Sequence, residues 1–399
     1  MTTTKKGFAT VGVLLAMVMV SANVPSALYG VYAKHFSFGP ATLTAIFATY
    51  VVFLIPSLLF WGQWSDHYGR NYALRIGLLF AILGTLSFMF AQGVIWLFVA
   101  RALQGLGAGI LSGPATAMLA ELDLTQKKAP LVAALATGGG TAIGPLLGGT
   151  IAQYGPYRLH LVYIVSLVGL IGIAIALFRI RETRSRPDSS FHWSRPKVPR
   201  QIRGIFWLAG GTAFIVWSVA AFFMSLAPSY VETLLHLTNL AIAGGIVFLM
   251  LATASVTQLV TRNFNPHKIM PIGLILTSVA VLGLVFSVPQ QSLILLIVST
   301  LLAGIGQGIA FLGSMKAITK AAPTDAKAGV VSSFYVLIYI GVGVPVVALG
   351  LLAQRLGLYN AMMYYAVFVV IVTIGLVGGL LRNQSSRSLS PITEAKKVL

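Results

Sequence analysis

The chain has 399 residues, of which 57% are hydrophobic and only 9% are charged, far below the roughly 25% charged residues of a soluble domain. This composition excludes a soluble globular protein and indicates a chain that lies mostly in lipid. A formal net charge of +19 is typical of a protein that binds nucleic acid, but no soluble domain is present here to bind one. We therefore expect no nucleic-acid partner. The chain contains no cysteine, which excludes disulfides, a thiol nucleophile and a thiolate metal site.

Twelve apolar segments are long enough to cross a bilayer, which takes about 20 residues each. We therefore predict an all-α membrane protein with twelve transmembrane helices. The spans are expected near 8–30, 41–60, 75–92, 95–119, 129–152, 159–179, 204–229, 238–261, 269–288, 291–315, 327–353 and 358–381. Because Lys5 and Lys6 precede the first span, a secretory signal cleaved near Ala22 is an alternative interpretation of this segment.

A short polar turn, WGQWSDHYGRNYAL, separates the second and third spans. Within it, Gly62, Asp66, Gly69 and Arg70 have the spacing G-x-x-x-D-x-x-G-R. Glycines allow two helix ends to approach closely, and the Asp and Arg are suited to a local charge pair at the membrane surface. The alternative interpretation is an ordinary cytoplasmic turn.

Arg101 lies about six residues inside the fourth span, in the sequence R-A-L-Q-G-L-G. An unpaired guanidinium in lipid is costly, so we expect Arg101 to face the protein interior or a wet cavity. A snorkelling structural arginine is the alternative.

The fifth span contains G-x-x-x-G-P-x-x-G-G, formed by Gly140, Gly144, Pro145, Gly148 and Gly149. Small residues four apart permit close helix contact, and the proline removes one backbone hydrogen bond and allows a bend. Generic tight packing is the alternative interpretation.

Positive charge marks the cytoplasmic side of a membrane protein. With the N-terminus inside, Lys34, Arg158 and Arg355 are outside, Arg101 is within a span, and every other Lys and Arg is on the inner side. Both termini are therefore expected in the cytoplasm. The basic central loop is expected to orient the chain and to contact anionic lipid headgroups.

The two halves of the chain show a repeat at a shift of about 200 residues. LQGLGAGI at 103–110 recurs as LAGIGQGI at 302–309, and Pro145 corresponds in position to Pro345. Ala152-Gln153 likewise matches Ala353-Gln354, and Pro25-Ser26 matches Pro228-Ser229. Parallel halves of this kind form a central cavity that opens alternately to either side. We predict bundles at 1–180 and 204–381, a linker at 181–203 and a cytoplasmic tail at 382–399.

These motifs, with the span count and the repeat, resemble the major facilitator superfamily, and the fifth-span pattern resembles the antiporter signature of its exporting branch. The resemblance covers essentially the entire chain. It implies that the 62–70 loop is a conformational latch that contacts the end of the eleventh helix. It also implies that Arg101 and Gln104 take part in proton coupling, and that the fifth-span motif favours export.

One feature departs from the cation-exporting relatives, since no span has a carboxylate near its middle. The first span has Asn23 where many relatives have an acid, which argues against strongly cationic substrates. The proton carrier stays open among Glu232, His160, Asp66 and Glu121.

The resemblance also implies that spans one, two, four, five, seven, eight, ten and eleven line the central cavity. Polar and aromatic side chains on these spans suit an amphipathic molecule. The candidates are Asn23, Tyr50, Gln104, Trp217, Phe223, Gln258, Gln307, Tyr335 and Tyr339.

We conclude from the sequence that the chain exports small amphipathic, drug-like compounds by proton antiport. The alternative is efflux or uptake of sugars or other small metabolites. We find no metalloprotease, nucleophile-elbow or P-loop motif, so we expect no enzyme, catalytic residue, metal or cofactor. A non-transporting sensor would not need Arg101. The expected partners are the substrate, protons and lipid, for a monomer in a bacterial inner membrane.

Overall fold

The computed structural model describes residues 2–123, 128–157, 159–180, 182–183, 198–234, 236, 238–324 and 326–395, and these contain helices and no strand. The elements are, in chain order, α1 Thr2–Asn23, η1 Val24–Leu28, α2 Tyr29–His35, α3 Pro40–Tyr68, α4 Arg70–Met89, α5 Val94–Leu122, α6 Ala129–Tyr154, α7 Leu161–Leu177, η2 Arg200–Ile202, α8 Arg203–Ser225, α9 Ala227–Leu234, α10 Leu240–Val260, α11 Pro266–Ser287, α12 Leu293–Ala321, α13 Lys327–Leu356 and α14 Leu358–Ala395.

The twelve predicted spans correspond to the apolar helices. Among the described residues, eleven helices are long and apolar enough to cross a membrane, and α7 is a shorter apolar helix of 17 residues. Two spans are interrupted near their ends, where a proline removes a helical hydrogen bond. Pro25 lies in the 3₁₀ turn η1, and Pro228 lies at the start of α9. α1 packs inside the molecule against α5, α6 and α7, which disfavours a cleavable signal.

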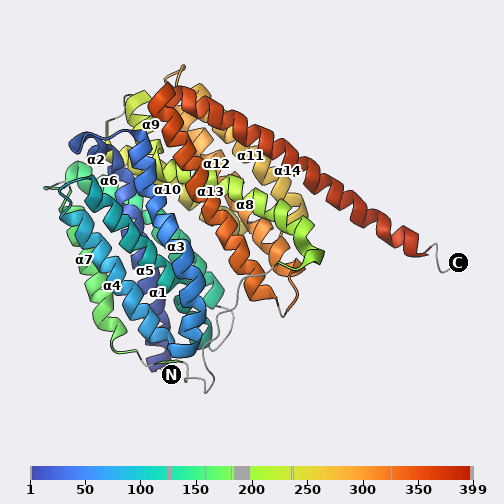
Figure 1. The fold of residues 1–399 in the computed structure, drawn as a ribbon, viewed down its shortest axis with the longest axis horizontal. Helices are drawn as coiled ribbons and strands as arrows, with labels where there is room; N and C mark the ends of the chain where they lie inside the picture. The colour runs from blue at the N-terminus through green and yellow to red at the C-terminus, as the bar shows by residue number, and fades with distance from the viewer. Residues whose placement is uncertain are drawn as a thin grey trace.

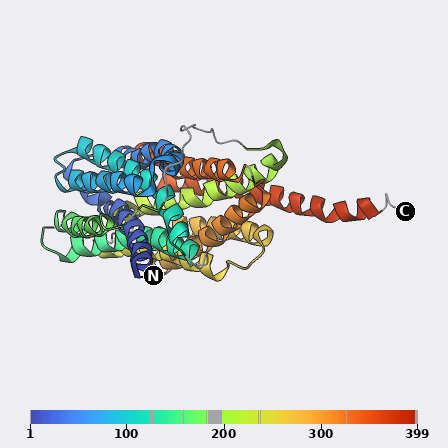
Figure 2. The ribbon, with the colours of Figure 1, turned by 90° about the horizontal axis from the view of Figure 1, so that it is seen from below.

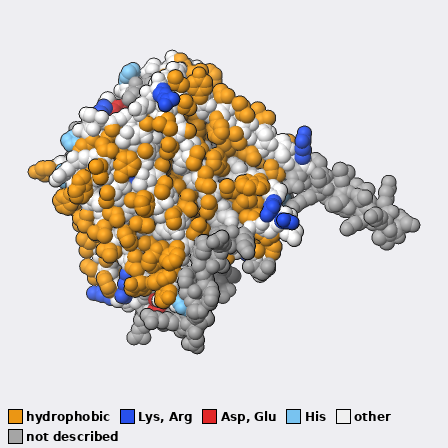
Figure 3. Space-filling view, in the orientation of Figure 1, with side chains coloured by type: hydrophobic (Ala, Val, Ile, Leu, Met, Phe, Trp, Pro, Cys, Tyr) orange, Lys and Arg blue, Asp and Glu red, His pale blue; other side chains and the backbone are white. Residues whose placement is uncertain are grey.

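The helices form two six-helix bundles, with α1 to α7 in the first and α8 to α14 in the second (Figures 1 and 2). α14 continues beyond the predicted boundary at 381 and projects away from the second bundle. Apolar side chains cover most of the face seen in Figure 3, and Lys and Arg lie at its rims. This is the surface expected of a protein immersed in lipid.

The repeated glycines make equivalent contacts in the two bundles. In α5, Gly105 and Gly109 press against the backbone of α3, and Gly107 presses against α4. In α12, Gly304 and Gly308 press against α10, and Gly306 presses against α11. A side chain at any of these positions would overlap its neighbour, so the glycines permit close helix approach in both bundles.

Contacts between the bundles concentrate toward one end of the molecule. We call the end that holds the N-terminus and residues 182–183 the linker end, and the end that holds α2 and α9 the distal end. Toward the distal end Gly149 of α6 meets Leu240 of α10, and Gly350 of α13 meets Pro40 of α3. The ribbons of the two bundles separate toward the linker end (Figure 1). The molecule is therefore closed distally.

Candidate functional site

The predicted interior arginine lies at the centre of a buried hydrogen-bond network. Arg101 is 2% exposed, and its Nη1 donates to Ala22 O at 2.8 Å and to Gln104 Oε1 at 3.0 Å. Gln104 Nε2 donates to Ser21 O at 3.2 Å. These bonds tie α5 to the last turn of α1, just before the 3₁₀ turn, where backbone carbonyls are left without helical partners. Arg101 is therefore held inside the first bundle and does not snorkel.

Aromatic rings from α3 complete the environment of the guanidinium. Arg101 Cζ lies 4.6 Å from the ring centroid of Tyr50 and 5.4 Å from that of Phe47. The faces of aromatic rings attract a cation, and the attraction is stronger where water is excluded. Arg101 Nε is buried and has no hydrogen-bond partner among the described residues. A buried positive charge of this kind favours neutral or anionic groups nearby and opposes cations.

The fifth-span motif joins α6 to two different neighbours. Gly140 and Gly144 face α1, where a Cβ at either position would lie 2.6 Å from the carbonyl oxygens of Ala16 and Val20. Gly148 presses against the Val24 carbonyl, still within the first bundle. Gly149 instead presses against the carbonyl of Leu240 in the second bundle. The motif thus packs one helix tightly within its bundle and also against the other bundle.

Pro145 takes part in the same contact between bundles. Its carbonyl oxygen meets the Cα side of Gly244 on α10, so closely that a Cβ at Gly244 would overlap it. Gln153 Oε1 accepts from Leu240 N at 2.9 Å at the distal end of the same seam. At Gly149 and Gly244 the backbones of α6 and α10 therefore come into close contact, which these glycines permit, and Gln153 adds a side-chain hydrogen bond.

The predicted latch loop is organised by a residue that the sequence did not single out. Gly69 ends α3 with φ of 109°, a backbone conformation that favours glycine. Glu182 accepts from the backbone N–H groups of Arg70 and Asn71, each at 2.9 Å. Its carboxylate therefore caps the N-terminus of α4, where the helix dipole favours negative charge.

Arg70 is buried and is also tied to its own bundle. Its Nε donates to Glu121 Oε1 at 3.3 Å and its Nη1 to Ser65 Oγ at 2.8 Å. A Cβ at Gly62 would meet nothing within 4 Å. The side chain of Asp66 lies outside the described residues. These contacts of Arg70 tie the loop to α3 and α5 of its own bundle.

The cap predicts a clear effect on stability. Gly69→Ala is expected to lower the free energy of unfolding by about 1–3 kcal/mol, because an alanine at this φ is strained and its Cβ would lie 2.7 Å from Glu182 Oε2. Glu182→Ala, which removes the cap, is expected to cost about 1 kcal/mol. Thermal unfolding in detergent measures both effects. Gly62→Ala is the matched control, and equal melting temperatures for the three variants would contradict this assignment.

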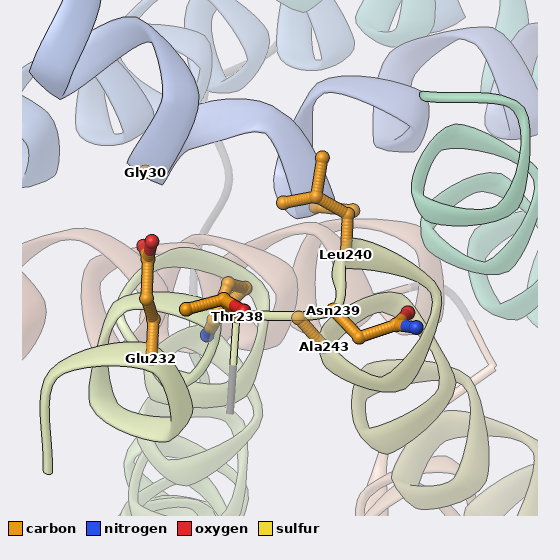
Figure 4. Close-up of a pocket in the computed structure, with 8 residues that line it drawn as sticks. Gly30, Glu232, Thr238, Asn239, Leu240 and Ala243 are labelled. Atoms are coloured by element: carbon orange, nitrogen blue, oxygen red, sulfur yellow. The ribbon is translucent and has the colours of Figure 1, made fainter. Parts of the chain in front are cut away.

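An ion pair connects α2 and α9 across the distal end. Lys34 Nζ contacts Glu232 Oε1, and Glu232 is the more buried partner, with 18% of its side chain exposed against 69% for Lys34. Figure 4 shows the carboxylate directed toward Gly30. A Cβ at Gly30 would lie 3.2 Å from Glu232 Oε2. The acid therefore fits against the first bundle because Gly30 has no side chain.

A small cavity of about 10 Å³ lies beside this ion pair, a volume that suits about one water molecule. Residues of both bundles line it: Ala27, Gly30, Pro228, Glu232, Thr238, Asn239, Leu240 and Ala243. Glu232 therefore borders a small, mostly apolar cavity at the boundary between the bundles.

The other predicted residues are not all brought together. His160 is exposed at the start of α7, away from the arginine network. Asn23 is buried, and its Nδ2 donates to Met19 O in its own helix at 2.8 Å. Phe223 is fully buried and packs edge-on against Phe222, so it belongs to the core of the second bundle.

Five predicted aromatic or amide residues keep partial exposure on helices that line the boundary between the bundles. Tyr335 and Tyr339 stack with ring centroids 6.4 Å apart on α13. Tyr50 and Gln258 are half-buried on α3 and α10. Trp217 is also half-buried, and its ring meets Phe311 edge-on at 5.5 Å. Gln307 is 2% exposed.

Sequence reasoning missed several residues of these networks. Ser21 and Thr85 share a hydrogen bond of 2.7 Å behind Gln104, and Phe47 contacts Arg101. Glu182 and Lys34 act through partners more than 100 residues away in the sequence. Lys34 alone had a sequence signal, as one of the few basic residues predicted on the outer side.

Comparison with known proteins agrees with this architecture. The sequence profile of the Major Facilitator Superfamily matches residues 9–343 and 248–397. The chain is 26% identical over 259 residues to "Multidrug resistance protein 1" of Bacillus subtilis, a match that covers 61% of this chain and 64% of that one. It is 25% identical over 319 residues to "Multi-drug resistance efflux pump PmrA" of Streptococcus pneumoniae, covering 76% and 77%.

Solved structures show the same fold at low identity. A bacterial homologue of the human lysosomal transporter Spinster, in an inward-facing and unoccupied conformation, matches with a TM-score of 0.76 at 12% identity. The match covers 94% of this chain and 97% of that one. A POT family transporter in complex with 5-aminolevulinic acid matches with a TM-score of 0.78 at 14% identity, covering 95% and 96%. The twelve apolar helices, the two bundles and the profile match together show that this chain belongs to the Major Facilitator Superfamily.

Proposed function

We propose that this protein exports small amphipathic compounds in exchange for protons, by alternating access between its two bundles. The observation that carries the proposal is the Arg101 network. Arg101 contacts α1 and α3 inside the membrane region, and a charged side chain there is costly, so it is expected to serve function. The similarity to a multidrug resistance protein and to a multi-drug resistance efflux pump supports an exporter.

The charge distribution supports an orientation with the linker end in the cytoplasm. The distal contacts then lie on the outer side of a bacterial plasma membrane, and the structure is closed outward. Export requires the α6–α10 and α3–α13 contacts to separate and the linker end to close. The 62–70 loop, which is tied to its own bundle here, is suited to act as the latch in the outward-open state. We expect a monomer.

Glu232 is the proton site that the geometry supports best. It is the described acid that forms an ion pair across the two bundles, and it borders a small cavity that residues of both bundles line. Glu121 is paired with Arg70 in the loop network, and His160 is exposed at a distance from the boundary. Protonation of Glu232 would remove its charge and the ion pair with it, so a proton from outside would favour outward opening.

The ion pair gives a testable expectation. Glu232→Gln is expected to abolish the dependence of export on the pH gradient while substrate still binds, because a permanently neutral side chain cannot take up or release the proton. Lys34→Met is expected to weaken distal closure but to keep the dependence on pH, because Glu232 remains. Transport at several external pH values measures both. If export by Glu232→Gln depends on the pH gradient as in the wild type, Glu232 is not the proton site.

The proposal is tested by substrate accumulation in energised inside-out vesicles. We expect chloramphenicol, a neutral amphiphile, to accumulate when the vesicle interior is acidic and to leak out when a protonophore is added. A sugar panel run in parallel tests the alternative substrate class. Accumulation of sugar alone would contradict export of amphipathic compounds, and accumulation unaffected by the protonophore would contradict proton antiport.

A further inference from the structure

The second bundle contains two buried polar groups that no protein group satisfies. Trp217 Nε1 on α8 and Gln307 Oε1 on α12 have no hydrogen-bond partner among the described residues. Leaving a donor or an acceptor buried and unpaired costs folding free energy, so such pairs of groups are uncommon unless they serve a purpose. One group is a donor and the other is an acceptor.

The packing of α12 shows where Gln307 points. Its neighbours Gly306 and Gly308 are pressed against α11 and α10 respectively. The face of α12 between these two contacts turns toward α8, on the inside of the bundle. Phe311 lies four residues after Gln307 on this same face.

Phe311 connects the two unpaired groups. Its ring meets the ring of Trp217 edge-on, with centroids 5.5 Å apart. Both rings are only half-buried, whereas the glycine faces of α12 are sealed. The buried donor of Trp217 and the buried acceptor of Gln307 therefore lie on the facing sides of α8 and α12, beside this partly exposed pair of rings.

Charge in the interior restricts what this surface can bind. The described transmembrane helices carry no carboxylate near their middles, and the first bundle contributes the buried Arg101. A cation would meet a positive potential and no counter-charge, at a cost that is large where water is excluded. A neutral group that both accepts and donates hydrogen bonds would satisfy both orphaned atoms.

We propose that Trp217, Gln307 and Phe311 form a subsite for the hydroxyl or amide group of a neutral amphiphile, and that this subsite makes the protein select neutral over cationic compounds. The inference rests on the proposed function, because it assigns the substrate class of that transporter. Trp217 Nε1 donates to the ligand, Gln307 Oε1 accepts from it, and Phe311 packs against its apolar body.

The test is equilibrium binding to purified full-length protein in detergent, which requires neither transport nor a proton gradient. The probes are chloramphenicol, which is neutral and carries hydroxyl and amide groups, and tetraphenylphosphonium, an amphipathic cation. We expect wild-type protein to bind chloramphenicol more tightly than the cation. Trp217→Phe keeps the ring but removes the N–H, and Gln307→Leu removes the acceptor, so each is expected to weaken chloramphenicol binding about tenfold.

Matched controls and one gain of function sharpen the result. Trp207→Phe is the same change on the exposed side of α8, and Gln290→Leu is a similar change in an exposed loop, so both are expected to bind as wild type does. Gln307→Glu is expected to improve binding of the cation at least tenfold, since it adds the missing counter-charge. Tighter binding of the cation by wild type, no chloramphenicol binding, or equal losses in the controls would overturn the proposal, even if the protein proves to be a proton-coupled exporter.

Discussion

Gly149→Leu is expected to abolish transport while leaving the protein folded. Gly149 presses against the Leu240 carbonyl of the other bundle, so a larger side chain there prevents distal closure without disturbing packing inside the first bundle. The protein would stay open at its distal end, and an exporter that cannot close outward cannot turn over. We expect transport to fall by at least about 100-fold, because the clash is with backbone and cannot be relieved by a rotamer change.

The absence of cysteine makes this expectation measurable. Spin labels at Gln92→Cys and Gln290→Cys, both exposed in distal loops of different bundles, report the distal opening with no background from native thiols. Gly149→Leu and Gly244→Leu are expected to lengthen the distance between the labels. Gly245→Leu is the control, because a Cβ there meets nothing within 4 Å. Wild-type distances in Gly149→Leu would contradict the assignment of this seam to distal closure.

Arg101→Ala is expected to abolish transport as well, by a different route. The substitution removes the two hydrogen bonds and both aromatic contacts of the guanidinium and leaves Gln104 without one partner. Arg101→Lys is not expected to restore function, because an ammonium lacks the planar geometry that meets a carbonyl, an amide and two rings at once. We expect at least about a 100-fold loss in both variants.

Arg75→Ala separates a specific role for Arg101 from a general loss of charge. Arg75 is exposed and also lies over an aromatic ring, that of Phe178, at 4.8 Å. Its removal is expected to leave transport near the wild-type level. Melting temperature and expression are measured beside transport for all three variants. A variant that fails to fold would lose transport together with expression and thermal stability. Normal transport in well-folded Arg101→Ala would show that the network is structural.

The twelve apolar segments and the repeat between the two halves predicted the fold, because lipid allows few structures other than apolar helices. Helix ends were harder to predict. Pro25 and Pro228 interrupt the first and seventh spans, and the sequence indicated their positions but not the 3₁₀ turn or the separate helix α9.

The site was predicted in part. Arg101 stood out because a charge in an apolar run is expensive, and Gly149 stood out through its motif. Glu182, Lys34 and Phe47 did not, because their roles come from partners distant in the sequence that only the packing of helices brings together. Phe223 was included as an aromatic residue on a lining helix, yet its face of α8 turns into the core of the second bundle.

Proton movement in inside-out vesicles tests proton-coupled export most directly. Vesicles that carry the protein are energised to an acidic lumen, and a pH-sensitive dye follows the lumen while a neutral amphiphile is added. We predict alkalinisation of the lumen on addition of substrate, since antiport moves protons out of the lumen as substrate enters. The response is expected to be absent in Arg101→Ala and retained in Arg75→Ala. Substrate uptake with no change of lumenal pH would contradict proton antiport.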